Sequence, residues 1–420
     1  MNFLPIHIAR RGLLSQFIFF LVALLLLAVL LAVYFSEEST VAPTPTATHT
    51  PSYDIVDSSN SFALDISKKL LLTGENEVIS PFSIYSAFLP VYEAASGDTR
   101  KEIIDVFKLP ENPILVRKDY EKLLTQLLSA RNTTIIIANG LWYQEGLTLV
   151  EDTRQAVEKF YKAVIKAVDF IGNPDSARDE INQWIEEKTM GKIKDTIDRL
   201  TRYTRAVIVN TIYFNATWIK PFHEIGLRKF QVSENSYVDV EMLNRITNAG
   251  YYEDSLLKAV EIPYAGGDYA MVVVLPKTDL GDLVGKLDPS YLEKIRENMD
   301  WAEVNITIPK FRVEEKYELV DTLKEMGIVK VFDPKTAELT NLFVEVKEQL
   351  FVSRVIHQTY VSVNKWGTEA AAATVVIIEK VSLPLPKYEF NANKPFLYMI
   401  IHRDTGLILF IGVITNPAPS

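Results

Sequence analysis

The sequence predicts a single α+β domain that runs from about residue 53 to residue 420. Apolar residues with helical spacing and strand-like apolar runs alternate along this stretch. No Pro/Gly-rich linker divides it, and no repeat period is present. A chain of 420 residues would also allow two domains, but the lack of an internal boundary favours one large core.

The composition is that of a globular protein with an acidic surface. The chain is 48% hydrophobic and 23% charged, with a net charge of −10. We expect no nucleic-acid partner, because phosphate binding requires clustered Lys and Arg. The sequence contains no cysteine, which excludes thiolate nucleophiles and Cys-ligated metal sites.

The amino-terminal segment is predicted to lie outside the folded domain. Residues 17–35 are apolar without interruption, and Leu13 and Leu14 extend this run. A helix of this length crosses a hydrocarbon core of about 30 Å and is longer than the roughly 7–15 apolar residues of a signal peptide. Arg10 and Arg11 precede it, so the positive-inside tendency places the amino terminus in the cytoplasm.

We therefore expect a single-pass, membrane-anchored protein whose domain lies outside the cytoplasm. Residues 1–36 would be a cytoplasmic tip and anchor (or an uncleaved signal), with residues 13–35 in the membrane. The alternative is a long cleaved signal, which would give a secreted protein. Residues 37–52 are rich in Pro and Thr and predict a stiff, extended spacer. Residues 53–420 would be the folded domain.

Helical spacing dominates the first part of this domain. Thr99 and Glu102 match a capping box ahead of a set of apolar residues. Two further sets of apolar residues recur with a helical period. They are Val157, Phe160, Tyr161, Val164 and Val168, and then Ile181, Trp184 and Ile185.

Strand-like runs are interleaved with the helical segments. Several of them are apolar on both faces, which predicts central strands of a large, covered sheet. The runs are residues 133–143, 206–214, 270–275, 352–363, 396–401 and 407–414.

The sequence shows no motif of an enzyme. The chain has five histidines, and none lies in a metal-binding or hydrolase motif. A catalytic site assembled from distant residues stays open, since triads form in space. Arg199, Arg202 and Arg205 could bind a polyanion, although neighbouring Asp195 and Asp198 favour a solvated face. We expect no enzymatic activity, no catalytic residue, no metal and no cofactor.

Residues 366–386 combine opposing conformational preferences. The alanines at 370–373 favour a helix, whereas the β-branched residues at 375–378 favour a strand. Alternate residues from Thr368 to Ile378 are small or apolar, and neither Pro nor Gly interrupts residues 368–382. The residues alone allow two interpretations, a permanently buried strand or an exposed loop that can become a central strand.

The run G-T-E-A-A-A-A-T at residues 367–374 resembles the hinge of the serpin family of protease inhibitors. Further stretches that are similar to family signatures are spread over the domain. They are N-E-V-I-S-P-F-S at 76–83, G-K-I-K-D at 191–195, V-N-T-I-Y-F-N-A-T-W-I-K-P-F at 209–222, F-N-A-N-K-P-F at 390–396 and F-I-G-V-I-T-N-P at 410–417.

The resemblance implies an α+β serpin fold with a large mixed sheet, two smaller sheets, about nine helices and an exposed reactive loop. It implies a monomeric suicide-substrate inhibitor that forms a covalent complex with a target serine protease. The cleaved loop would insert into the main sheet as a new strand. The alternative is a non-inhibitory serpin acting as a carrier or chaperone, which a hinge of small residues without Pro disfavours.

The resemblance also assigns roles within the reactive loop. The scissile bond would join Val381 to Ser382, which favours elastase-like or subtilisin-like targets. A shift of one residue would make Lys380 the specificity residue and trypsin-like enzymes the targets. The hinge would consist of Gly367, Thr368, Glu369, Ala370, Ala371, Ala372, Ala373 and Thr374.

A polar cluster beneath the opening sheet, called the shutter, would comprise Ser80, Ser83, Asn210 and His357. At the breach, where the loop first enters the sheet, the resemblance places Trp218.

Lys365, also at the breach, departs from the family pattern. Serpins usually carry a Glu at this position that pairs with a Lys. Either an acidic partner has exchanged roles with it, or the closure of the sheet is looser. Residues 126–134 are short and carry little basic charge, so we expect no activation by glycosaminoglycan.

Overall fold

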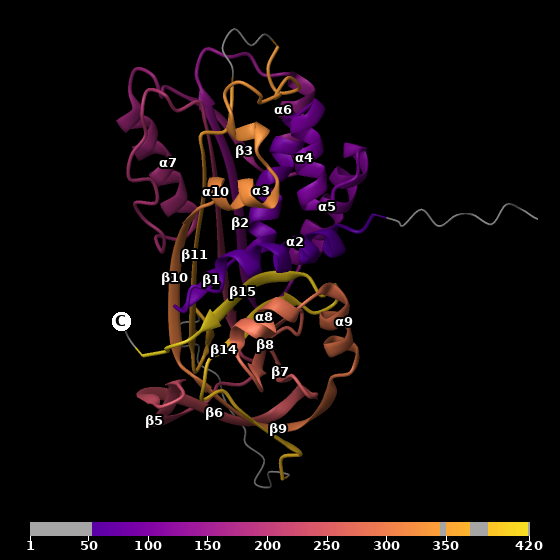
Figure 1. The fold of residues 1–420 in the computed structure, drawn as a ribbon, viewed down its shortest axis with the longest axis vertical. Helices are drawn as coiled ribbons and strands as arrows, with labels where there is room; N and C mark the ends of the chain where they lie inside the picture. The colour runs from indigo at the N-terminus through magenta and orange to yellow at the C-terminus, as the bar shows by residue number, and fades with distance from the viewer. Residues whose placement is uncertain (1–52, 345–349, 370–384, 419–420) are drawn as a thin grey trace, which may run out of the picture. The chain divides into compact units, whose positions relative to one another are not determined.

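Two β-sheets flanked by helices make up the folded part of the chain (Figure 1). The computed structural model describes residues 53–344, 350–369 and 385–418. The expected loop residues Ala370, Ala371, Ala372, Ala373, Thr374, Lys380, Val381 and Ser382 lie outside these ranges.

The predicted membrane-anchored location needs correction. None of the helices within residues 53–344, 350–369 and 385–418 is long and apolar enough to cross a membrane. The predicted anchor at residues 13–35 and the spacer at 37–52 lie outside the described residues. The described structure therefore gives no sign of an anchor.

The expected number of about nine helices is confirmed within the described residues. A short 3₁₀ helix, η2 (Lys330–Phe332), follows the last α-helix. The α-helices are α2 (Ile55–Leu70), α3 (Pro81–Ala94), α4 (Gly97–Phe107), α5 (Pro113–Leu128), α6 (Glu151–Lys159), α7 (Pro174–Lys188), α8 (Leu280–Lys286), α9 (Pro289–Glu297) and α10 (Val320–Met326).

Three helices begin with the same local signal, an Asn or Asp cap followed directly by Pro. Asn112, Asn173 and Asp288 cap α5, α7 and α9, and each side chain accepts a hydrogen bond from a backbone N–H of the first turn. Pro is suited to the next position, because its fixed φ is helical and the first N–H of a helix has no partner within the helix.

The predicted capping box at Thr99 is wrong. Helix α4 already begins at Gly97, so Thr99 lies within its first turn. The carboxylate that caps this helix belongs to Glu338, which accepts from the N–H groups of Asp98 and Thr99. Glu102 accepts instead from the N–H groups at the start of η2. A distant segment thus replaces the local cap.

The helix expected through residues 157–168 divides into two elements. Helix α6 ends at Lys159, and Lys162 adopts a φ of +52°. Strand β3 (Val164–Val168) follows. Val157 and Tyr161 are buried as expected, but the residues after the left-handed turn pair with a sheet.

The six-stranded sheet is mixed and holds the long central strands. Its order is β10-β11-β12-β4-β2-β3. Strand β11 is parallel to β4 and β2 is parallel to β3, whereas the other neighbours are antiparallel. Besides β3, the strands are β2 (Thr133–Gln144), β4 (Ala206–Thr217), β10 (Phe311–Glu318), β11 (Arg354–Asn364) and β12 (Gly367–Thr368).

The nine-stranded sheet lies toward the other end of the folded unit, beside α8 and α9 (Figure 1). The long strand β6 pairs with β5 and β9 and then with β7, which joins the two expected smaller sheets into one network. The strands are β1 (Glu77–Ile79), β5 (His223–Ser233), β6 (Ser236–Glu253), β7 (Leu257–Pro263), β8 (Tyr269–Pro276), β9 (Asp300–Pro309), β13 (Tyr388–Asn391), β14 (Phe396–His402) and β15 (Ile408–Ile414).

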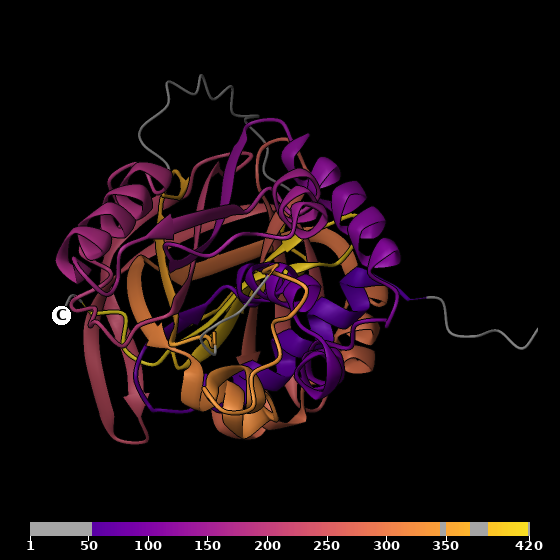
Figure 2. The ribbon, with the colours of Figure 1, turned by 90° about the horizontal axis from the view of Figure 1, so that it is seen from above.

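Helices cover the six-stranded sheet on both faces. Helix α7 lies on one face and α3 to α6 lie on the other (Figures 1 and 2). Ile181 and Ile185 of α7 are fully buried against Val207 and Val209 of β4. Any strand that enters this sheet must therefore fit between two packed layers.

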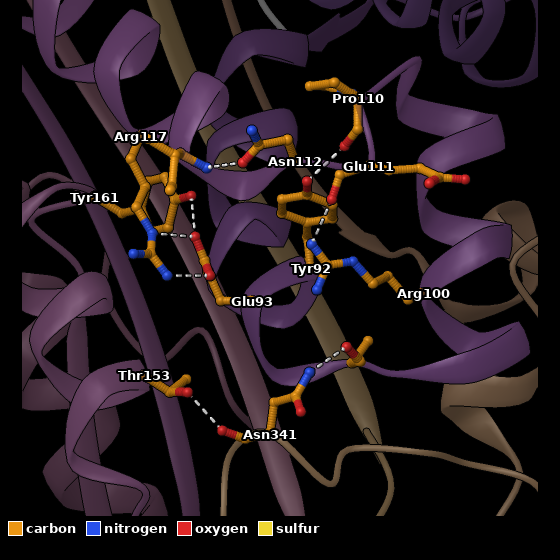
Figure 3. A network of polar contacts seen from close by, with 12 residues as sticks. Tyr92, Glu93, Arg100, Pro110, Glu111, Asn112, Arg117, Thr153, Tyr161 and Asn341 are labelled. Atoms are coloured by element: carbon orange, nitrogen blue, oxygen red, sulfur yellow. Dashed lines mark hydrogen bonds and ion pairs between the residues drawn. The ribbon is translucent and has the colours of Figure 1, made fainter.

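A buried ion pair joins helices α3 and α5 to the segment that follows α6 (Figure 3). Arg117 of α5 donates two hydrogen bonds to Glu93 of α3, and the Tyr161 hydroxyl donates to the same carboxylate at 2.6 Å. The Glu93 side chain is only 4% exposed. This network stabilises the helical layer because each acceptor of the buried charge has a donor.

Candidate functional site at the base of the loop

The seam is the line along which β4 and β11 adjoin in the six-stranded sheet. Residues 207–211 pair in parallel with residues 354–358. At the opposite end β12 lies between the two strands and pairs with both. Between these regions, residues 212–215 and 359–362 do not pair with each other within the described part of the chain. The seam is closed at one end and already holds the first residues of an added strand at the other.

Gly367 allows β12 to fit against β4. It pairs with Thr217 on one side and with Asn364 on the other. A Cβ atom at Gly367 would overlap the carbonyl oxygen of Ala216. A larger residue therefore cannot occupy this place unless one of the strands shifts.

Thr368 is buried and contacts an aromatic stack. Its hydroxyl lies 2.5 Å from the hydroxyl of Tyr264, and its side chain is 1% exposed. The Tyr264 ring stacks on Trp218, with the ring centroids 4.5 Å apart. Trp218 Nε1 donates to the carbonyl oxygen of Asn364 at 3.0 Å. Trp218 thus contacts the hinge through Tyr264, a residue that the sequence analysis missed.

Glu369 forms a bend directly after β12. Its φ is +56°, a left-handed conformation that is uncommon for residues other than Gly. Its N–H donates to the carbonyl oxygen of Ser362 at 2.7 Å. Its side chain is 3% exposed, and Oε1 lies 3.0 Å from Nζ of Lys192. Burial raises the pKa of Glu369, and the charge of Lys192 opposes that effect.

Lys365 has an acidic partner despite its reversed sign. Its Nζ lies 3.0 Å from Oε2 of Glu224 on β5, and its carbonyl oxygen accepts from the N–H of Phe222. Of the two alternatives that Lys365 left open, an exchange of roles with an acidic partner fits these contacts. Both side chains are partly exposed, so the pair adds little to stability by itself.

His357 lies at the centre of a directional chain of hydrogen bonds beneath the closed end of the seam. Its Nε2 accepts from the N–H of Ser80 at 3.0 Å, and its Nδ1 lies 2.9 Å from Oδ1 of Asn210. Because Nε2 is an acceptor, Nδ1 carries the proton and donates to Asn210. Full burial lowers the pKa of His357 to about 3, so the ring is neutral.

The chain of hydrogen bonds continues through two residues that the sequence analysis missed. Asn210 donates to Asn139 of β2 at 2.6 Å, and Asn139 donates to the hydroxyl of Ser86 at 2.9 Å. The sequence contained a signal for Asn139, because its side-chain amide lies inside the apolar run at residues 133–143. A buried polar group of this kind needs hydrogen-bond partners.

The two predicted serines differ in their contacts. The Ser80 hydroxyl donates to the carbonyl oxygen of Leu409 at 2.6 Å. Ser83 joins through its carbonyl oxygen, which accepts from the Ser86 hydroxyl at 2.8 Å, and its own hydroxyl has no hydrogen-bond partner among the described residues. Within the described residues, no group of His, Asp and Glu side chains could hold a metal ion.

Comparison with known proteins agrees with this geometry. The sequence model of the family described as "Serpin (serine protease inhibitor)" matches residues 57–417. The chain belongs to the serpin family. Serpins are generally protease inhibitors rather than enzymes, and they generally act on target proteases. The expected α+β serpin fold is confirmed.

Relatives of this serpin occur in archaea and animals. An uncharacterized serpin-like protein of Thermococcus kodakarensis is 38% identical, over 86% of each chain. Human Serpin B4 is 32% identical, over 86% of this chain and 99% of its own. The native-state crystal structure of the thermophilic serpin Tengpin matches with a TM-score of 0.78 at 25% identity, covering 86% of this chain and 94% of its own.

Proposed function

We propose that this serpin is a suicide-substrate inhibitor of serine proteases. The cleaved loop would enter the seam between β4 and β11, continue β12 as a full strand and trap the acyl-enzyme. The observation that carries this proposal is the position of β12, which already pairs with both strands. It lies ahead of residues 212–215 and 359–362, which do not pair with each other in the part of the chain that the structure describes.

The register of β12 supports a complete insertion. Thr368 lies opposite Ala216 of β4 and Val363 of β11. If the strand continued antiparallel from there, Ile377 would face both Val207 and Arg354. These two residues are each other's partners at the closed end of the seam. The segment up to Ile377 therefore has the length that both strands can accept.

The side chains of the segment suit the two covered faces of the sheet. Thr368 points toward Tyr264, so Ala370, Ala372 and Thr374 would follow on the same face. These residues are small and need little space between packed strands. Insertion would convert free backbone groups into ladder hydrogen bonds and bury apolar side chains, which drives the reaction forward.

The chemical step would take place at the Val381–Ser382 bond. The protease serine Oγ would attack the carbonyl carbon of Val381, and its proton would pass through the protease histidine to the leaving amine of Ser382. The C–N bond would break, and an ester would join Val381 to the protease. Insertion of the freed loop would then have to precede hydrolysis of this ester.

The specificity residue is proposed to be Val381, which suits elastase-like and subtilisin-like enzymes. If Lys380 filled this role, trypsin-like enzymes would be the targets. The intact mass of the cleaved chain distinguishes the two, because cleavage after Lys380 instead of Val381 moves one valine between the fragments.

A gel assay tests the proposal. The full chain is mixed with an elastase-like or a subtilisin-like protease and then denatured in SDS. We expect a band at the summed mass of inhibitor and protease. Rapid cleavage of the loop without such a band would contradict the proposal.

A hinge variant provides the matched control. Ala372→Arg places a long charged side chain on the face that must enter the core. We expect cleavage at the same bond with little or no complex, because insertion becomes slower than hydrolysis of the ester. Ala372→Ser, which stays small, should retain the complex.

A carrier function is the second candidate, and one cavity favours it. A pocket of about 450 Å³ lies between α2, α9 and strands β8, β14 and β15. Its lining includes the apolar side chains of Ile295, Met399 and Ile401 and the charged side chain of Arg296. Pockets of this size and lining bind small molecules in many proteins. The gel assay separates the two functions, since a carrier needs no covalent complex with a protease.

A further inference from the structure

The carboxylate of Glu369 lies over the seam on the face that α7 covers. Tyr213 of β4 and Arg312 of β10 are its neighbours from the sheet. The guanidinium of Arg312 in turn lies over the ring of Tyr360 of β11. Lys192 reaches it from the segment that joins α7 to β4, and its Nζ lies 5.9 Å from the centroid of the Tyr360 ring. The end of β12 is thus held by a residue from outside the sheet.

A buried carboxylate needs its counter-charge. The Glu369 side chain is 3% exposed, whereas that of Lys192 is 47% exposed. Without the lysine, the carboxylate would lose the counter-charge that pairs with it directly, and only the longer-range attraction of Arg312 would oppose its burial. Loss of a directly paired charge is strongly unfavourable for a buried group. Withdrawal of the hinge into water relieves this cost. Further insertion does not, because an extended Glu369 would still face the covered side.

We propose that Lys192 is a positioning residue that keeps the hinge seated in the seam before the protease arrives. The inference rests on the proposed function, because a seated hinge leaves less of the loop to insert. Insertion must be faster than hydrolysis of the ester for the protease to be trapped. Loss of the contact would leave the loop cleavable but slower to insert, and more inhibitor would be consumed for each protease molecule trapped.

Hydrogen exchange of the hinge tests the contact without any protease. In Lys192→Met, the amides of Thr368 and Glu369 should exchange about tenfold or more faster than in the wild type, because the seated state is less populated. Lys192→Arg keeps the charge and should exchange close to the wild-type rate. Lys194→Met is the matched control, since Lys194 lies in the same segment but pairs with Glu186 at the surface.

The double variant Lys192→Met/Glu369→Gln identifies charge as the cause. A neutral amide carries no buried charge, so fast exchange should be largely reversed. Acidification should reverse it in the single variant too, once Glu369 takes up a proton, whereas the wild type should change less. If Lys192→Met exchanged at the wild-type rate, or if the double variant exchanged as fast as the single one, the inference would be overturned.

Inhibition provides the second readout. The number of inhibitor molecules consumed per protease molecule should rise several-fold in Lys192→Met and stay unchanged in Lys194→Met. The inhibitory function and the role of Lys192 can be contradicted separately. A wild type that forms no SDS-stable complex contradicts the proposed function but leaves the exchange result in force. If the wild type forms the complex but the hinge amides of Lys192→Met exchange at the wild-type rate, only the role of Lys192 is contradicted.

Discussion

At the residue scale, His357 has a protonation state that its contacts determine. The ring is fully buried between the N–H of Ser80 and the amide of Asn210. A second ring proton would have to replace the hydrogen bond that Nε2 accepts from Ser80. Neutrality of this one ring is therefore a condition for the intact chain of hydrogen bonds.

We predict a pH dependence of stability that comes from His357. Well above pH 6.5 neither the folded nor the unfolded chain protonates this residue, so it has no effect. Below pH 6.5 the unfolded chain takes up a proton, while the folded protein does so only near pH 3. The free energy of unfolding should therefore fall with pH, by about 2 kcal/mol at pH 5 from this residue.

Denaturant titration at pH 8 and pH 5 measures this contribution. His357→Gln should be less stable at both pH values, because it disrupts the hydrogen bonds, but its loss between them should be smaller by the stated amount. An equal loss in the variant and the wild type would mean that His357 does not titrate as described.

The site residues that could be predicted from the sequence are those that the family resemblance assigns. Ser80, Asn210 and Trp218 lie within the quoted family stretches, and His357 was assigned with them to the shutter. Partners set by tertiary structure were not, because Glu224 lies far from Lys365 along the chain and nothing local marks it. Asn139 could have been found, since it interrupts an otherwise apolar strand.

At the scale of elements, most of the strands that were predicted are buried on both faces, although β1 and β7 share this burial and were missed. All six predicted runs form strands, with ends shifted by a few residues. Strands β5, β6, β7, β9 and β10 were not predicted, because several have exposed or charged positions that break the apolar pattern. The prediction of the α4 cap failed for a related reason, because the capping residue Glu338 comes from a distant segment.

The fit of β12 against β4 gives a steric prediction. In Gly367→Ala the new methyl group would meet the carbonyl oxygen of Ala216, so the hinge should leave the seam. Overpacking of this kind costs about 1–3 kcal/mol. We expect faster hydrogen exchange at Ala216 and Thr217 as well as a change in the emission of Trp218.

Gly285→Ala is the control for this substitution. Gly285 lies in helix α8, and a Cβ there has no neighbour within 4 Å. It should leave the hinge unchanged and stabilise the helix slightly, since Ala is the better helix former. Equal behaviour of the two variants would show that Gly367 is not under steric constraint.

The far end of the loop is fixed by a separate element. Strand β13 pairs in parallel with β9, and the Tyr388 ring stacks on Tyr251 with the ring centroids 4.2 Å apart. The Tyr388 hydroxyl donates to Asp300 at 2.6 Å. An uncut loop is thus held at β12 and at β13, so it can insert fully only if β13 detaches.

Loosening β13 should therefore allow insertion without cleavage. Tyr388→Ala removes the stack and the hydrogen bond, and we expect it to lose inhibitory activity several-fold faster on warm incubation while the chain stays intact. Tyr237→Ala, at an exposed position on β6, serves as the control. Equal rates of loss for both variants would contradict a restraining role of β13.

At the scale of the whole molecule, insertion should change thermal stability. A complete strand adds about ten backbone hydrogen bonds at roughly 1 kcal/mol each, together with buried apolar surface. Cleavage near the scissile bond should therefore raise the thermal midpoint by about 10 °C or more. Calorimetry before and after limited proteolysis measures this change. A midpoint that stays constant would indicate that the cleaved loop remains outside the sheet.

The arrangement of the whole fold was predictable through resemblance more than through residue patterns. Alternating helices and strands gave the α+β class, but they could not give the order of strands. That order joins residues distant in sequence, such as β1 with β15 and β13 with β9. Long-range pairing depends on the complete core rather than on any one segment.

The direct pairing of β4 with β11 offers a way to place the inhibitor under redox control. Ile208 and Val355 are partners across the closed end of the seam, and both are buried. Strands lie about 4.8 Å apart, within the range that a disulfide spans. Because the chain has no cysteine, Ile208→Cys/Val355→Cys would create a single covalent staple. The oxidised protein should be cleaved as an ordinary substrate without forming the covalent complex. A reductant should restore formation of the complex.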